Sequence, residues 1–133
     1  MSDITIKSLL PTIHFEIKPT MSEAELFQNQ VLRPILKFQT SGICRVSLIY
    51  CFQMNPGFGA LSGTKKRKML NDLLSGNQAL RNQLTGMIIS FFDKADWDFY
   101  VTQQKDLNKR IIAMIQIRVL EQYEKYLQIQ PAK

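Results

Sequence analysis

The chain has 133 residues, 45% of them hydrophobic, and a formal net charge of +6 from 17 Lys and Arg against 11 Asp and Glu. This length and balance fit one folded domain with one core, and they exclude collagen-like, low-complexity and wholly disordered classes. One histidine and two cysteines are too few for most metal sites and nucleophilic triads, while the basic balance favours acidic partners or nucleic acid.

The first stretch of the chain differs from the rest. Between Ile4 and Ile17, isoleucine and phenylalanine alternate with polar residues, and Pro11 and Pro19 interrupt the pattern. Alternation with a period of two is typical of extended chain. We therefore expect residues 1–21 to form an N-terminal arm or a short hairpin.

The single histidine lies in this arm. His14 and Glu16 would share one face of a strand, but two ligands do not complete a metal site and the chain has no second histidine. We expect neither a metal nor another cofactor. The arm also lacks the basic and apolar regions of a secretory signal, so the cytoplasm is the expected compartment.

Residues 22–130 are expected to form a single helical domain. Ser22 followed by Glu25 matches a capping box and predicts a helix start. Helical spacing of apolar residues continues beyond it, and Pro34 is expected to kink this helix rather than end it. From Ile43 to Phe52 the apolar residues surround most of the helix, which predicts the most buried segment.

The two cysteines lie in this apolar segment. Cys44 and Cys51 are seven residues apart, which in a helix is two turns, or about 10 Å, and too far for a disulfide. We expect both to be free, buried and unreactive thiols. The segment contains polar residues and is shorter than the roughly 20 residues that span a bilayer, so no membrane helix is expected.

In the second half of the chain, segments rich in helix-breaking residues alternate with segments of helical pattern. Residues 55–63 are rich in proline and glycine and predict a loop. Helices are expected at 64–74, at 77–91, after a cap at Asp93, and at about 104–128. The prediction is an all-α bundle of about five helices.

The glycine loop does not match a nucleotide-binding motif. A P-loop needs a glycine five residues before Gly63 and a lysine directly after it, and Thr64 follows instead. A dinucleotide fingerprint starting at Gly57 would need glycine or alanine where Ser62 stands. The pattern is therefore typical of a plain connection between helices.

Basic residues suggest two alternative functions. The densest charge run follows the glycine loop, and it indicates either a solvated helix face or a site for phosphate groups of nucleic acid. An anion-binding protein or enzyme would instead use a pocket near the loop with Arg33, Arg81 or Arg110. The candidate anion or nucleic-acid contacts are Lys65, Lys66, Arg67, Lys68, Arg81 and Arg110.

The last predicted helix has an unusually wide apolar face. Its apolar residues cover about half the circumference, which exceeds the roughly 100° stripe of a helix with one contact face. Either the helix lies at the centre of its own bundle or one side packs on a second copy, and we favour the second. The candidate interface residues are Ile111, Ile112, Ile115, Val119, Leu120, Tyr123, Tyr126 and Leu127.

Three segments carry a resemblance. VLRPILKFQ at 31–39, LTGMII at 84–89 and LNKRI at 107–111 are similar to segments of a group of small helical bacterial proteins of unknown function, over about residues 22–128. Some members are labelled glyoxalase-like, but that superfamily uses strand-rich modules with histidine and glutamate metal ligands, whereas this sequence is predicted to be helical and has one histidine, His14. The resemblance implies a bacterial protein without assigned catalytic residues, and a common scaffold that includes Arg33, Gly86, Asn108 and Arg110.

These patterns together predict a non-enzymatic helical interaction or regulatory module. The expected partner is a second copy of the chain in a homodimer, and another protein is a further candidate partner. Nucleic acid is the alternative that the basic run suggests, and a small ligand or substrate is the alternative that a pocket near the glycine loop would indicate.

Overall fold

The computed structural model describes residues 6–128, and within them every regular element is helical. This confirms the predicted all-α bundle. The seven α-helices are α1 (Ile6–Leu9), α2 (Glu23–Phe27), α3 (Arg33–Met54), α4 (Gly63–Gly76), α5 (Gln78–Ile89), α6 (Lys94–Thr102) and α7 (Gln104–Gln122). Three further turns are a π-helical turn at Gln28–Leu32 between α2 and α3, a 3₁₀ turn at Phe58–Ala60 between α3 and α4, and a 3₁₀ turn at Tyr123–Tyr126 after α7.

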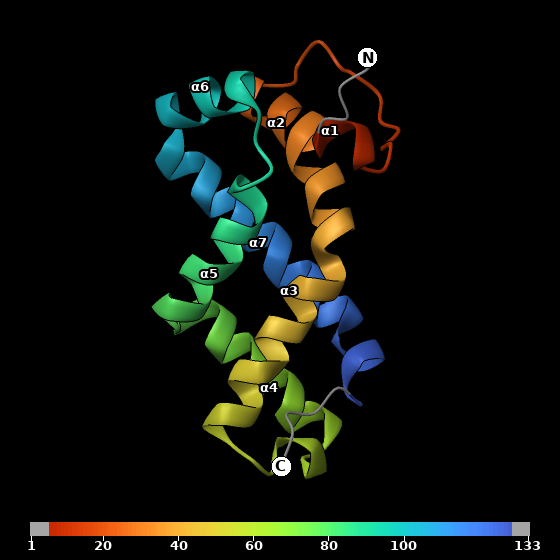
Figure 1. The fold of residues 1–133 in the computed structure, drawn as a ribbon, viewed down its shortest axis with the longest axis vertical. Coiled ribbons are helices and arrows are strands. Elements are labelled where there is room, and N and C mark those ends of the chain that lie inside the picture. The colour runs from red at the N-terminus through yellow and green to blue at the C-terminus, as the bar shows by residue number, and fades with distance from the viewer. Residues whose placement is uncertain (1–5, 129–133) are drawn as a thin grey trace.

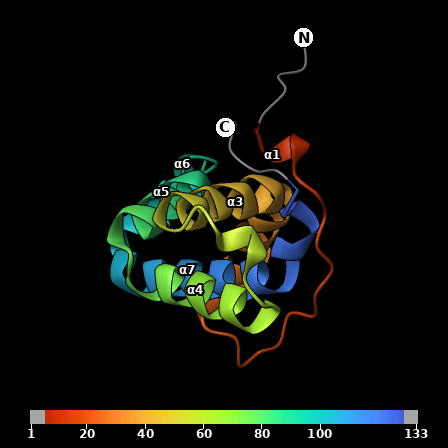
Figure 2. The same ribbon diagram turned by 90° about the horizontal axis from the view of Figure 1, so that it is seen from below.

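Four helices make up the body of the molecule. Figure 2 shows α3 and α5 in one layer and α4 and α7 in a second layer below them. Each of the four contacts the other three, and each contributes fully buried side chains, such as Leu48, Leu70, Leu84 and Ile115, to one core. The short helices α1, α2 and α6 lie together at one end of the bundle (Figure 1).

The N-terminal arm contains no hairpin in its described part. Ile6–Leu9 forms a helical turn, and no strand follows before α2 begins, so the expected hairpin is wrong there; Ile4 lies outside the described residues. Proline has no amide hydrogen to donate to a strand ladder, and the bundle offers no sheet for the arm to join. Instead Leu10 packs against the core, and the Lys7 ammonium lies 2.8 Å from a carboxylate oxygen of Asp96.

The helix from residue 23 to residue 54 continues past its proline, as predicted. The Ser22 hydroxyl accepts a hydrogen bond from the amide of Glu25 at 3.1 Å and starts the helix. The ring of Pro34 would clash with the carbonyl four residues earlier in a regular α-helix. The preceding π turn widens the helix, since the amide of Arg33 donates to the carbonyl of Gln28, five residues back.

The predicted loop and the later helices are also present, with shifted boundaries. The Phe58 ring is fully buried and lies 5.3 Å from the ring of Phe52, so the loop is anchored to the core. Ser62 caps α4, and α4 therefore begins at Gly63, inside the predicted loop. The last helix changes to a 3₁₀ turn at Tyr123 instead of running to residue 128.

The wide apolar face of α7 is covered within the chain. Helix α7 contacts α3, α4 and α5, so it has three neighbours to cover its apolar arc. This corrects the inference that a second copy is needed, because half of the candidate interface belongs to the protomer's own core. The fully buried members are Ile111, Ile115, Val119 and Tyr123, and the half-buried members are Ile112, Leu120, Tyr126 and Leu127.

Candidate functional site

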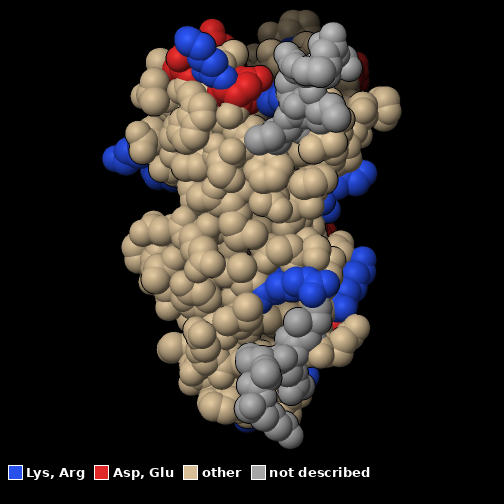
Figure 3. Space-filling view, in the orientation of Figure 1, with Lys and Arg blue, Asp and Glu red and all other residues tan. Residues whose placement is uncertain are grey.

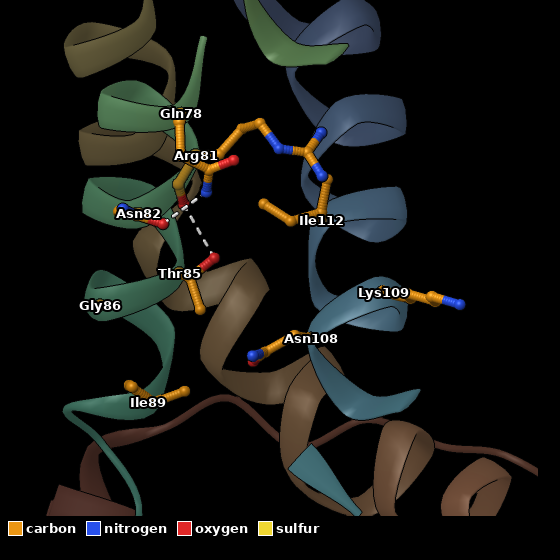
Figure 4. A pocket seen from close by; sticks show the side chains of 9 residues that line it. All are labelled: Gln78, Arg81, Asn82, Thr85, Gly86, Ile89, Asn108, Lys109 and Ile112. Atoms are coloured by element: carbon orange, nitrogen blue, oxygen red, sulfur yellow. Dashed lines mark hydrogen bonds between the residues drawn. The ribbon is translucent and has the colours of Figure 1, made fainter. Parts of the chain in front are cut away.

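A cleft of about 370 Å³ opens between α5 and α7 (Figure 4). Its α5 wall carries polar side chains at positions 78, 82 and 85, which recur at helical spacing and share one face. None of the lining residues is acidic. The residues that line this α5/α7 cleft are Gln78, Arg81, Asn82, Thr85, Gly86, Ile89, Asn108, Lys109 and Ile112.

Arg81 is the central charged group of the cleft. Its Nη1 donates to the carbonyls of Leu74 at 2.9 Å and Ser75 at 3.2 Å, at the end of α4 where carbonyls lack intrahelical partners. Its Nε and Nη2 make no hydrogen bond with any residue from 6 to 128. In Figure 4 the guanidinium reaches from α5 to the side of Ile112 on α7.

Amide side chains supply most of the other polar groups. Gln78 Nε2 donates to Asn82 Oδ1 at 2.7 Å, and the Tyr100 hydroxyl donates to Asn108 Oδ1 at 2.6 Å. These bonds occupy the acceptor oxygens of both asparagines and leave their NH₂ groups as donors. Asn108 extends from α7 toward α5 and presents its NH₂ group to the cleft, whereas Asn82 lies on the side of α5 away from α7 (Figure 4).

The other two predicted anion-binding arginines lie away from this cleft. Arg33 Nη1 donates to Asn29 Oδ1 at 3.1 Å, and Arg110 Nε forms an ion pair with Asp106 at 3.2 Å. Neither lines the cleft that contains Arg81. The structure therefore does not join the three arginines in one pocket.

The basic run on α4 does not form a single positive face. Four consecutive helical residues point in directions 100° apart, so the run from Lys65 to Lys68 spreads around the helix. Arg67 Nη1 donates to the carbonyl of Leu120 on α7 at 2.9 Å. A hydrogen bond and ion pair at 2.8 Å with Asp72 raises the pKa of Lys68. The run is therefore divided between structural contacts and solvent.

A second pocket lies near the glycine loop, where the sequence suggested one. Its volume is about 520 Å³. It contains none of the three predicted arginines, and Asp72 offsets the charge of Lys68 inside it. Its lining residues are Met54, Lys65, Lys68, Met69, Asp72, Leu73, Gly76 and Asn77.

The remaining reactive side chains do not assemble into a catalytic or metal centre. Burial raises the pKa of Cys44 to about 11 and that of Cys51 to about 12, so both are protonated thiols at neutral pH. His14 is exposed. Among residues 6–128, no three His, Cys, Asp or Glu side chains lie close enough to hold a metal ion.

A second surface of interest is the outer side of α3. Phe38 and Ile49 keep 46% and 41% of their surface exposed. They lie on nearly the same side of the helix, about 16 Å apart along its axis. Val46 and Tyr50 are half-buried beside them. This gives α3 an apolar strip that no described part of the chain covers.

The strip continues onto α5. The rings of Phe38 and Phe91 lie 5.6 Å apart, and the Tyr50 hydroxyl donates to Gln83 Oε1 at 3.0 Å. We call this surface the α3/α5 face, formed by Phe38, Gly42, Val46, Ile49, Tyr50, Gln83, Met87 and Phe91.

Charged side chains are scarce on this surface. Helix α5 has one charged residue, Arg81, and it lines the cleft; the charged residues of α3 are Arg33, Lys37 and Arg45. Arg45 lies between Phe38 and Ile49 on nearly the same side of α3. It donates to the Ser41 hydroxyl at 3.0 Å and stacks over the ring of Tyr126 at 5.5 Å, so it borders the face. Figure 3, in which α3 and α5 face the viewer, shows charges at the upper end and edges and basic side chains reaching onto the lower right of the front, with uncharged residues across the left and centre.

Sequence reasoning identified one wall residue of the cleft by its chemistry and missed the amides. Arg81 was one of the candidate anion contacts of the alternative functions, and Gly86 and Asn108 appear among the residues of the resemblance. In the sequence, the spacing of Gln78, Asn82 and Thr85 predicts that these polar residues share one helix face. It does not indicate which other helix that face borders.

No helix within the described part of the chain combines the length and the apolar character needed to cross a bilayer. No protein-family model matches the sequence, and comparisons with curated proteins and with solved structures gave no match.

Proposed function

We propose that the protein is a non-enzymatic helical interaction module that self-associates through the α3/α5 face. The observation that supports this is a surface on which Phe38 and Ile49 are exposed and charged side chains are few, on a chain whose net charge is +6. Exposed apolar groups gathered in one patch mark interaction surfaces more often than scattered ones do. Phe38 and Ile49 form the centre of this patch.

Charge favours a second copy as the partner. Two chains of charge +6 repel each other, and like charges brought face to face across an interface cost several kcal/mol. In a two-fold dimer each patch meets itself. Because the residues that define the α3/α5 face are uncharged, two copies can meet there with few lysines and arginines opposite one another.

The dimensions of the layer are compatible with a modest dimer interface. Helix α3 has 22 residues and is about 33 Å long. The α3/α5 face runs along α3 from Phe38 to Tyr50, about 18 Å, with α5 packed about 10 Å beside it, so it is smaller than the roughly 800 Å² per partner of a standard interface and suits a weak dimer. We therefore expect a reversible dimer.

The test compares two equivalent substitutions. Ile49→Lys places a charge on the α3/α5 face, twice in each dimer, and is expected to give single chains in sedimentation velocity while the helical circular dichroism is retained. Ile117→Lys makes the same change on α7, at a side chain that is 62% exposed and outside the face, and is expected to leave the dimer intact.

Two results would reject the proposal. One is a wild-type protein that sediments as a single chain at every concentration tested. The other is a dimer that survives Ile49→Lys or is lost with Ile117→Lys, because either outcome places the contact elsewhere.

A further inference from the structure

We infer that the α5/α7 cleft binds a small organic oxyanion, a carboxylate or phosphate monoester whose apolar body lies over Gly86. This inference is independent of the proposed self-association, because the cleft lies on the other side of α5 from Met87 and the α3/α5 face. It rests on the charge, the hydrogen-bonding groups and the shape of the cleft.

The charge of Arg81 is not neutralised by an anion. Its only hydrogen-bond partners among residues 6–128 are the carbonyls of Leu74 and Ser75, which are uncharged. The ion pairs in that range involve other cations, such as Lys68 and Arg110. A half-buried guanidinium without a carboxylate favours an anion from solution.

The unused hydrogen-bonding groups are mostly donors. They are Nε and Nη2 of Arg81 and the NH₂ group of Asn108. Lys109 also lines the cleft, but its side chain points away from α5 in Figure 4. A cation would find no carboxylate in this lining. A neutral polyol would need acceptors as well, and the only unoccupied side-chain amide oxygen is that of Gln78. An oxyanion, which accepts several hydrogen bonds at once, matches this set best.

The cleft also has an apolar part. A Cβ atom added at Gly86 would meet no atom within 4 Å, so this glycine leaves open space on the wall of α5. Ile89 and Ile112 border that space. The volume of about 370 Å³ lies at the lower end of small-molecule sites. The ligand is therefore a small molecule with an apolar body rather than a bare inorganic anion.

The experiment is a titration followed by amide chemical shifts of the full chain. Four probes are used: phenyl phosphate, benzoate, inorganic phosphate and the neutral benzyl alcohol. We expect saturable shifts at residues 78–89 and 108–112 with phenyl phosphate or benzoate, and the comparison of these two identifies the acid group. Inorganic phosphate is expected to bind more weakly, and benzyl alcohol to cause no saturable shift.

Variants separate binding from folding. Arg81→Gln is expected to weaken binding about tenfold, the usual cost of losing one charge-assisted contact. Lys105→Gln removes the same charge from an exposed site on α7 outside the cleft and is expected to change binding little. Gly86→Leu fills the open space without touching the core, so it should abolish binding while the protein stays folded.

The inference is overturned by any of three results. Shifts centred on residues 65–68, or equal losses in Arg81→Gln and Lys105→Gln, would show general attraction to a basic protein. Equal affinity for inorganic phosphate and phenyl phosphate would show that the apolar body of the ligand contributes nothing to binding. Undiminished binding by folded Gly86→Leu would place the ligand outside the cleft.

Discussion

Two aspartates at the start of α6 connect the arm to the bundle. Asp93 Oδ1 accepts from the amide of Asp96 at 2.9 Å, and Asp96 Oδ2 accepts from the amide of Asp93 at 3.1 Å. The Lys7 ammonium lies 2.8 Å from Asp96 and 3.5 Å from Asp93. The hydrogen bond from the Asp96 amide, aided by Lys7, lowers the pKa of Asp93 below its ordinary value.

The cap at Asp93 gives a pH-dependent prediction. Asp93→Ala should lower the free energy of unfolding by about 1 kcal/mol at neutral pH, the usual cost of losing an N-cap, while Asp93→Asn keeps a capping oxygen and serves as the control. Because the folded pKa is depressed, the ionic part of this stabilisation is present above the unfolded pKa and is lost as pH falls through the folded pKa.

Urea unfolding of wild type and Asp93→Asn checks this at neutral pH and at a pH below the folded pKa of Asp93. The difference in the free energy of unfolding between wild type and Asp93→Asn should become smaller in acid. A difference that stays constant over this range would show that the carboxylate charge contributes nothing to the cap.

Helix α7 shows how far periodicity alone can predict packing. The sequence correctly indicated a wide apolar face, but periodicity reports only which residues of one helix share a side. Which neighbour covers that side depends on long-range contacts, and here α3, α4 and α5 do so. Val119 and Ile117, two residues apart, therefore lie in opposite environments, one fully buried and one exposed.

These two positions make a direct prediction about α7. Val119→Lys should greatly destabilise or unfold the protein, because a lysine without a partner in the core leaves an unpaired charge buried. Ile117→Lys should change the free energy of unfolding by no more than about 0.5 kcal/mol, as exposed substitutions usually do. Thermal circular dichroism measures both. A folded, stable Val119→Lys protein would show that position 119 tolerates exposure to water. It would then support the interface on α7 that the sequence predicted.

Helix starts were predictable because capping is local chemistry. Ser22, Ser62, Asn77 and Asp93 each accept a backbone hydrogen bond three residues ahead, and such spacing is visible in a sequence. Helix interiors and ends were less predictable. The π turn before Pro34 depends on how the ring is accommodated, and the end of α7 is set by tertiary contacts around Tyr123.

The candidate sites were less predictable than the helices. Asn82 and Asn108 lie on different helices, and no local pattern shows that both border one cleft. The arginines looked equivalent in the sequence, yet Arg33 and Arg110 are held by neighbouring side chains and Arg81 alone of the three lines the cleft.

Charge distribution over the molecule explains why the basic composition does not by itself indicate a nucleic-acid surface. Basic residues are spread over α4, the cleft and the edges of the α3/α5 face, and several make structural contacts, as Arg67 and Arg81 do. Charged side chains are few on the surface proposed for self-association (Figure 3). We expect the dissociation constant of a dimer that forms through this surface to depend on salt in a characteristic way.

Sedimentation equilibrium of the wild-type chain at low and high NaCl tests the proposed assembly most directly. If two copies of charge +6 meet through an uncharged face, salt screens the repulsion between them and leaves the apolar contact intact. The predicted result is a dimer whose dissociation constant stays level or falls as salt rises. A single chain at every salt concentration, or a dimer that dissociates as salt rises, would contradict it.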